Sequence, residues 1–205
     1  MAAYLAIPAG AAAQELVIDR DYGWLERVKA SRARGTTPCR EADHFGQKPM
    51  TAQTDFRQLL VPVTAFAQGR RLDATLQREL NLQFPPAGEL FQGVVQACHA
   101  GIAAGWMCRE GDSKRRFGRI FEAAEATHGF SIDVVDITDL VGNHHRHPTG
   151  EIDMIMPVTP EAKFDGNGAG WLVYAPDTGH RPTVTAGRAL ILYLLPEGKI
   201  EWTDQ

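Results

Sequence analysis

The sequence predicts an α+β protein in which a helical N-terminal region precedes an antiparallel β-sandwich or barrel. Apolar residues recur at helical spacing up to residue 105, and after it they alternate at the two-residue spacing of strands. The candidate strands are also short and are separated by turn-forming residues. We therefore expect a flexible tail over residues 1–14, a helical region over 15–105 and a β-domain over 106–205.

Within the helical region, we expect a helix over residues 15–30 with a break near Gly23, and a loop over 34–53, where Gly, Pro, Thr and charged residues are frequent. Residues 56–66 form a short apolar segment that is expected to be helical and to break at Pro62, because proline lacks a backbone N–H.

Asp73 is placed to cap a helix that runs through Leu80, since its carboxylate can accept the free amide hydrogens of a first turn. A last helix is expected to begin near Pro85 and to stop at Gly105. Its apolar face repeats every four residues: Leu90, Val94, Cys98 and Ile102. This face is expected to pack either on the β-domain or against a second subunit.

The β-domain is expected to contain at least five strands, because apolar and polar residues alternate or β-branched and aromatic residues concentrate there. The candidate strands are 116–121, 130–134, 151–158, 170–175 and 188–195. Turn-forming residues occupy 165–168, 176–179 and 196–198. In the strand over 151–158, Ile152, Met154 and Met156 share one face.

Composition excludes several classes of protein. The chain of 205 residues has 44% apolar and 22% charged residues, a composition that is ordinary for a globular protein. Its formal charge is -4, so it lacks the basic excess of a general nucleic-acid binder. Three cysteines are too few for a disulfide framework. The N-terminus lacks the pattern of a secretory signal, and no apolar run is long enough to span a bilayer, so we expect a cytoplasmic protein without a nucleic-acid or membrane partner.

The clearest candidate site is a group of histidines. His145 and His147 are two residues apart, so in an extended chain they share a face, and a Pro-Thr-Gly turn can return Glu151 beside them. His180 follows a second turn and can reach the same pocket through a hairpin. Imidazoles with one carboxylate commonly bind zinc, iron, manganese or nickel, so these four residues are the candidate ligands of one divalent metal ion and the candidate catalytic residues.

These spacings resemble the two metal-binding motifs of the cupin superfamily, which implies a cupin-like antiparallel β-barrel, or jelly roll. His145, His147 and Glu151 match the first motif, and Gly170 through His180 resembles the second. Some flanking positions depart from the pattern. Asp139 and Asp177 stand where the motifs usually have glycine, and Val184 stands where asparagine is frequent.

A denser resemblance, over about residues 115–200, is to the 4-hydroxylaminobenzoate lyase family of nitroaromatic degradation. The matching segments are 127–135, 145–153, 164–166, 170–171, 180–184 and 187–190. The resemblance implies conversion of 4-hydroxylaminobenzoate to 3,4-dihydroxybenzoate (protocatechuate) with release of ammonia, and a small aromatic carboxylate as substrate. It also implies a homodimer, since cupin-like chains often pair.

An aromatic carboxylate requires a cation and an apolar wall. Arg119, Arg181 and Arg188 are the candidates to pair with the carboxylate, and the sequence does not rank them. Trp171 and Tyr174 are the candidates to pack on the ring. The two aromatic residues lie on opposite faces of one strand, so only one of them can face the interior. Two other functions stay open: another metal-dependent cupin enzyme, such as an aromatic dioxygenase or an isomerase, and a non-catalytic ligand-binding module.

Overall fold

The computed structural model describes residues 53–203, which fall within one compact unit, Gly46–Gln205. Its helices are α1 (Gln53–Ala67), α2 (Ala74–Gln83), α3 (Glu89–Ala103) and the short 3-10 helix η1 (Glu125–Thr127). Its strands are β1 (Glu110–Gly111), β2 (Arg115–Phe121), β3 (Phe130–Val141), β4 (His145–His147), β5 (Glu151–Pro157), β6 (Lys163–Phe164), β7 (Gly170–Tyr174), β8 (Thr178–His180), β9 (Thr183–Pro196) and β10 (Glu201–Trp202). The expected tail over 1–14, helix over 15–30 and most of the loop over 34–53 lie outside the described residues.

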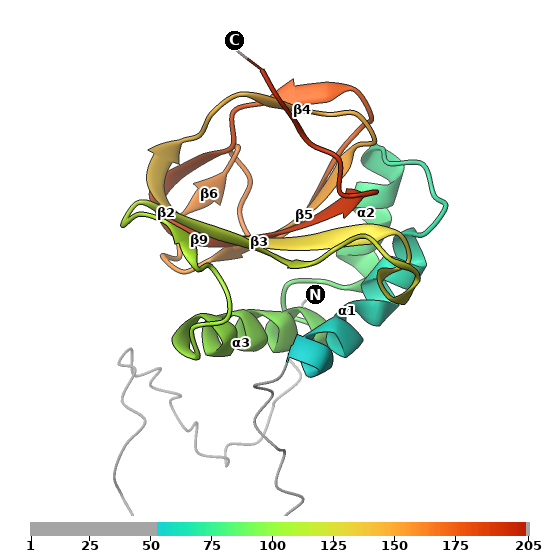
Figure 1. Ribbon diagram of the computed structural model, residues 1–205, viewed down its shortest axis with the longest axis horizontal. Helices are drawn as coiled ribbons and strands as arrows, with labels where there is room; N and C mark the ends of the chain where they lie inside the picture. Colours follow the sequence, from blue (N-terminus) through green and yellow to red (C-terminus); the bar gives the residue numbers. More distant parts are fainter. Residues whose placement is uncertain (1–52, 204–205) are drawn as a thin grey trace, which may run out of the picture. The chain divides into compact units, whose positions relative to one another are not determined.

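The strands form two antiparallel sheets that are arranged around a ring, with the helices outside it (Figure 1). The larger sheet has the order β1-β2-β3-β9-β5-β7, with β6 also paired to β9. The smaller sheet has the order β10-β4-β8. Every strand pair is antiparallel. The α+β class with a cupin-like barrel, expected from the sequence, is confirmed.

The larger sheet is apolar on both faces because each face has a different partner. On β9, Leu190, Leu192 and Leu194 join the cluster that includes the helices, whereas Ile191 and Tyr193 belong to the cluster inside the barrel. β5 is divided in the same way, with Ile152, Met154 and Met156 on the helix side as expected. The other face of β5 therefore points inward, and it carries Glu151 and Asp153, which are also buried.

Helix α1 continues through Pro62, so the expected break at this residue is wrong. Proline removes the hydrogen bond to the carbonyl of Gln58, but both residues lie on the exposed face, where water can solvate that carbonyl. The opposite face holds Phe56, Leu60 and Val63, which are almost completely buried. Packing of this face keeps the segment helical although the cost of an internal proline is about 3 kcal/mol.

The other two helices follow the sequence expectations closely. The Asp73 carboxylate accepts from the amides of Thr75 and Leu76 at 2.8 and 3.1 Å and caps α2, as predicted. The repeating face of α3 packs on the helix side of the sheet in the same apolar cluster. Since this face is covered by the chain's own sheet, the homodimer stays a prediction. Among the described helices, none has the length and apolarity needed to cross a bilayer.

Candidate metal centre and adjoining cavity

The site begins on β4, where alternation separates neighbouring side chains. His145 and His147 point inward and are 4% and 0% exposed. Arg146 lies between them and points the opposite way, where it pairs with Glu201 at 2.7 Å and with Asp177 at 3.2 Å. The strand therefore presents two imidazoles to one face, as the two-residue spacing predicts.

A tight turn then returns the chain to the same site. The amide of Gly150 donates to the carbonyl of His147 at 3.1 Å, and Gly150 has a φ of 85°, which glycine adopts without strain. A Cβ at this position would lie 2.8 Å from the backbone oxygen of Tyr174, so the turn has no room for a side chain. Glu151, the first residue of β5, is thereby placed beside His147.

The fourth residue arrives on β8, which pairs with β4 in a register that sets His145 opposite His180. Residues 176–179 were expected to form a turn only, but strand β8 already begins at Thr178. Pairing with β4 supplies this strand's hydrogen bonds, and the sequence of the turn alone does not contain that information. The expected return of His180 to the pocket is nevertheless what the structure shows.

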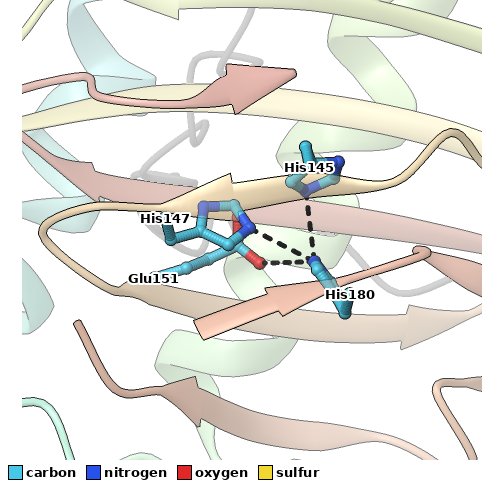
Figure 2. A group of neighbouring side chains, drawn as sticks. All are labelled: His145, His147, Glu151 and His180. Atoms are coloured by element: carbon cyan, nitrogen blue, oxygen red, sulfur yellow. Dashed lines mark hydrogen bonds and ion pairs between the residues drawn. The ribbon is translucent and has the colours of Figure 1, made fainter. Parts of the chain in front are cut away.

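The four side chains converge, and the interactions drawn between them meet at His180 (Figure 2). One ligand atom from each of His145, His147, Glu151 and His180 lies within 4.8 Å of the others. His180 Nε2 is 3.2 Å from the Nε2 atoms of both other histidines and 3.6 Å from Glu151 Oε1. His147 Nε2 is 3.2 Å from Glu151 Oε2.

Two of the imidazoles are oriented by acceptors behind them. His145 Nδ1 is 3.2 Å from the carbonyl oxygen of Asn143, and His180 Nδ1 is 2.6 Å from Asp165 Oδ2. Both acceptors require the hydrogen to be on Nδ1. The Nε2 atoms of His145 and His180 then face each other with bare lone pairs at 3.2 Å, an arrangement that a cation between them would stabilise.

Burial shifts the pKa values of three of the cluster residues toward their uncharged forms. Desolvation and the neighbouring His180 lower the pKa of His145 to about 4, and desolvation with His145 and His180 lowers the pKa of His147 to about 3. Burial, followed by the charge of Asp153, raises the pKa of Glu151 well above its usual range. Neutral imidazoles are the form that binds metals, so His145 and His147 need no proton loss before they can bind one.

Several buried polar atoms at this position have no hydrogen-bond partner. They include Glu151 Oε1 and His147 Nδ1, together with both carboxyl oxygens of Asp153, which is 0% exposed. Unpartnered buried oxygens are costly, and a cation beside them would compensate part of that cost. With the bare Nε2 atoms, they show that the buried group of three histidines and one glutamate can hold a metal ion.

A cavity of about 470 Å³ adjoins the cluster. Of the four clustered residues, His145 and Glu151 line it, whereas His147 and His180 lie behind them. Its remaining walls are charged at some points and apolar or aromatic at others. They are formed by Glu110, Arg115, Phe117, Gly118, Arg119, Asp133, Val135, Ile137, Asn143, Pro182, Tyr193, Leu195, Ile200 and Trp202. The volume is in the range of pockets that hold small organic ligands, about 300–1,000 Å³.

The expected substrate-binding residues lie in different places. Arg119 lines the cavity, but Arg181 is exposed and lies outside its walls. Arg188 also lies outside the walls and pairs with Asp136 at 2.7 Å. Trp171 faces the helices, where it packs on Phe84 and Phe91 and donates to the carbonyl of Phe84 at 2.8 Å. Tyr174 faces the interior as the alternation requires. Its ring lies 4.4 Å from that of His180, and it too lies outside the cavity walls.

Asp165 is the functional residue that sequence reasoning missed. It was assigned to a turn, and it does adopt a turn-like φ of 46°. Its carboxylate nevertheless accepts from His180 Nδ1, from the Tyr174 hydroxyl at 2.5 Å and from the Thr183 amide at 2.7 Å. Burial alone would raise the pKa of Asp165, but these hydrogen bonds outweigh it and the pKa is lowered. An aspartate before glycine is so common in turns that the sequence carries no separate signal for this role.

The departures from the cupin motifs have a simple structural explanation. Asp139 has a φ of 40° and Asp177 has a φ of 65°, so both positions use the left-handed region that favours glycine. Aspartate is one of the few other residues that enters this region at low cost, because its short side chain can hydrogen-bond locally. The Asp139 carboxylate accepts instead from the Gly187 amide on β9 at 2.8 Å. Both aspartates thus adopt a backbone conformation that glycine also adopts, Asp139 at an irregularity within β3 and Asp177 in the turn before β8.

Together, the antiparallel barrel and the buried three-histidine, one-glutamate cluster define a cupin-type protein with a site that can hold a metal. The model of the family described as "PnbB: 4-hydroxylaminobenzoate lyase" matches residues 58–202. The chain therefore belongs to the 4-hydroxylaminobenzoate lyase family.

Two relatives carry the same description. The 4-hydroxylaminobenzoate lyase of Nocardioides sp. (strain LMS-CY) is 29% identical over 162 residues, which cover 75% of this chain and 96% of the relative. That of Pseudomonas putida is 28% identical over 174 residues, which cover 76% and 98%.

Solved structures with a similar chain path include an RmlC-like cupin protein from Ralstonia eutropha JMP134. It has a TM-score of 0.35 and 13% identity, over 46% of this chain and 62% of that one. A chain from the DMSP lyases RdDddP and RnDddQII also has a TM-score of 0.35, with 15% identity over 74% of this chain and 93% of that one.

Proposed function

We propose that this protein converts 4-hydroxylaminobenzoate to 3,4-dihydroxybenzoate and ammonia, as a lyase of nitroaromatic degradation. The observation that carries the proposal is the placement of His145 and Glu151, which belong to the buried cluster and also line the cavity. A molecule in this cavity would touch a carboxyl group and an imidazole in a site largely removed from water. The family membership and the names of the two relatives support the same substrate.

We further propose that His145, His147, Glu151 and His180 hold one divalent metal ion, either iron, manganese, zinc or nickel. The bare Nε2 atoms and Glu151 Oε2, which lies 3.2 Å from His147 Nε2, support this. When bound, such an ion would polarise an oxygen of the ligand and lower the pKa of a bound water. Glu151 has two distinct oxygens, because Oε2 faces His147 at 3.2 Å whereas Oε1 lacks a hydrogen-bond partner.

The reaction makes three demands, and together they consume one water. The N–O bond must break as its oxygen takes a proton and leaves as water. A second water must add to the ring carbon next to the nitrogen-bearing carbon. A third must hydrolyse the resulting C=N bond, which releases ammonia and leaves the second hydroxyl group after the ring regains aromaticity. No external oxidant is needed, because the nitrogen is reduced as the ring carbon is oxidised.

Glu151 is the residue best placed to move these protons. We assign to its Oε1 the proton that the departing oxygen takes, and the same atom can recover a proton from the water that adds to the ring. Such general acid–base catalysis contributes about 10²- to 10⁴-fold to a rate. The cavity walls supply aromatic surface from Phe117, Tyr193 and Trp202, on which a benzene ring can pack.

The test is ammonia release from 4-hydroxylaminobenzoate by the purified full chain, with Glu151→Gln and His145→Ala as variants. Each is expected to lose at least about 100-fold in rate, because a proton donor or a cluster residue is removed. His99→Ala is the matched control, since His99 is exposed on α3 and lies outside the cavity. Full activity in both site variants, with folding verified by circular dichroism, contradicts the proposal. Oxygen consumption without ammonia release favours a different cupin enzyme.

A further inference from the structure

One strand provides both arginines of the cavity wall. Arg115, Phe117 and Arg119 occupy alternate positions of β2, and all three line the cavity. In the register with β3 they stand opposite Ile137, Val135 and Asp133, which also line it. This face of β2 therefore presents a cation, an aromatic ring and a second cation to the space beside His145 and Glu151.

The two arginines differ in what they already bind. All three guanidinium nitrogens of Arg119 are occupied: Nε donates to Asp133 at 2.8 Å, Nη1 to Glu122 at 3.0 Å and Nη2 to the Gly198 carbonyl at 3.2 Å. Its charge is balanced by two carboxylates. If Arg119 were to turn toward a ligand, Asp133 would lose its ion-pair partner and keep the Ser131 hydroxyl as a donor, while its side chain stays only 17% exposed, which is costly.

Arg115 has no such commitment. Its guanidinium carbon lies 5.5 Å from the centre of the Phe117 ring, and within residues 53–203 it forms no ion pair with a carboxylate. A guanidinium held against an aromatic face keeps its planar edge available for a bidentate contact with a carboxylate. Of the two arginines that line the cavity, Arg115 is thus the one that forms no ion pair within residues 53–203, although, after backbone hydrogen bonds, its charge helps to lower the pKa of Asp112.

We propose that Arg115 binds the carboxylate of the aromatic substrate and that Phe117 supports the ring, so that Arg115 is a specificity-determining residue. This rests on the proposed function, because it takes the substrate to be a benzoate. The carboxylate and the reacting nitrogen stand at opposite ends of 4-hydroxylaminobenzoate. Arg115 on β2 and Glu151 on β5 both line the cavity, so the proposal places one end of the substrate at each. Arg119, the residue expected from sequence, then acts as a fixed wall residue.

The assignment is tested by binding of two stable probes, 4-aminobenzoate and aniline, measured by calorimetry. The probes differ only in the carboxylate. Arg115→Gln is expected to weaken 4-aminobenzoate binding about 10- to 100-fold, the range for a charged bidentate contact, and to leave aniline binding unchanged. Arg115→Lys keeps the charge without the planar fork and should give an intermediate loss. In turnover, Arg115→Gln should raise the KM for 4-hydroxylaminobenzoate more than it lowers kcat.

Two further variants serve as comparisons. Arg116→Gln alters the neighbouring residue on the opposite face of β2, where Arg116 pairs with Asp136, and should leave the ratio of the two affinities at the wild-type value. Arg119→Gln should change the ratio much less than Arg115→Gln. Wild-type 4-aminobenzoate affinity in folded Arg115→Gln, or a larger loss in Arg119→Gln, overturns the assignment alone. Failure of the wild-type chain both to bind 4-aminobenzoate and to release ammonia overturns the proposed function and the assignment with it.

Discussion

Replacement of Asp165 by asparagine is the most informative single change, because it separates the orientation of His180 from the presence of His180. The Asp165 carboxylate accepts three hydrogen bonds, from His180 Nδ1 at 2.6 Å, the Tyr174 hydroxyl at 2.5 Å and the Thr183 amide at 2.7 Å. Asparagine has the same shape but only one accepting oxygen. If that oxygen keeps the Thr183 amide, the NH₂ group faces His180.

An NH₂ group facing His180 Nδ1 favours the tautomer with the hydrogen on Nε2, which is the atom that points into the cluster. His180 must then return to its original tautomer, without an acceptor for its Nδ1 hydrogen, before it can bind a metal. Removal of such an outer-shell acceptor typically weakens metal binding about 10- to 100-fold, or about 1.4–2.7 kcal/mol. We expect Asp165→Asn to lose metal affinity in this range.

The assay is competition for Mn²⁺ and Zn²⁺ against a fluorescent chelator, at fixed pH, with the wild type measured in parallel. Tyr174→Phe is the matched control, because it removes one of the three hydrogen bonds and leaves the carboxylate in place, so its loss should be smaller. Asp177→Asn removes an exposed carboxylate that pairs with Arg146 and should have no effect. Unchanged metal affinity in Asp165→Asn, with a lower melting temperature, would show a purely structural role and refute the reasoning.

Three further predictions concern stability. Gly150→Ala should lower the free energy of unfolding by at least about 2 kcal/mol, because its Cβ would lie 2.8 Å from the Tyr174 backbone oxygen. Gly129→Ala is the control: Gly129 has a similar φ of 84° with open space around it, so the change should cost about 1 kcal/mol. Equal losses in urea titrations would contradict this. Asp136→Asn should destabilise by about 1–2 kcal/mol at pH 7, since two partly exposed arginines pair with this carboxylate. Burial alone would raise the pKa of Asp136, but the hydrogen bonds that it accepts from Arg188 and Arg116 lower it. The carboxylate therefore stabilises the fold above the unfolded pKa of about 3.9, and this stabilisation disappears as the pH falls through the folded pKa. A stability difference between the wild type and Asp136→Asn that persists at pH 2 would contradict this sign. Trp171→Phe should lower the free energy of unfolding by about 1–3 kcal/mol, because the Phe84 carbonyl loses its donor. The affinity for 4-aminobenzoate should stay unchanged, and a loss of that affinity would show that Trp171 contacts the ligand.

The periodicity of the sequence was sufficient to predict a β-sandwich or barrel and three residues of the cluster, whereas the cupin-like barrel came from the resemblance. His145 and His147 share a face because a strand alternates, and Glu151 follows from the turn residues before it. These are local relations within residues 145–151, so the sequence contains them directly. His180 lies 35 residues from His145 and reaches it because β8 pairs with β4, so the turn before His180 made this return possible without fixing it.

Pairing between distant strands could not be predicted in the same way. Asp165 orients His180 across 15 residues, and Arg115 faces the cavity because β2 pairs with β3 in one register rather than another. The alternation of Arg115, Phe117 and Arg119 was a usable signal that these three share a face, but which face was undetermined. Continuation of α1 through Pro62 likewise depends on tertiary packing of the opposite helix face, which outweighs a local rule.

The most direct test is metal analysis of the purified full chain, followed by ammonia release from 4-hydroxylaminobenzoate with and without a chelator. We expect about one divalent ion per chain, loss of that ion and of ammonia release with the chelator, and recovery of both when the ion is restored. Glu151→Gln should show how far the carboxylate contributes to each quantity. A metal-free wild-type protein that releases ammonia at the full rate would contradict the metal centre, and a metal-loaded protein that releases none would contradict the proposed lyase reaction.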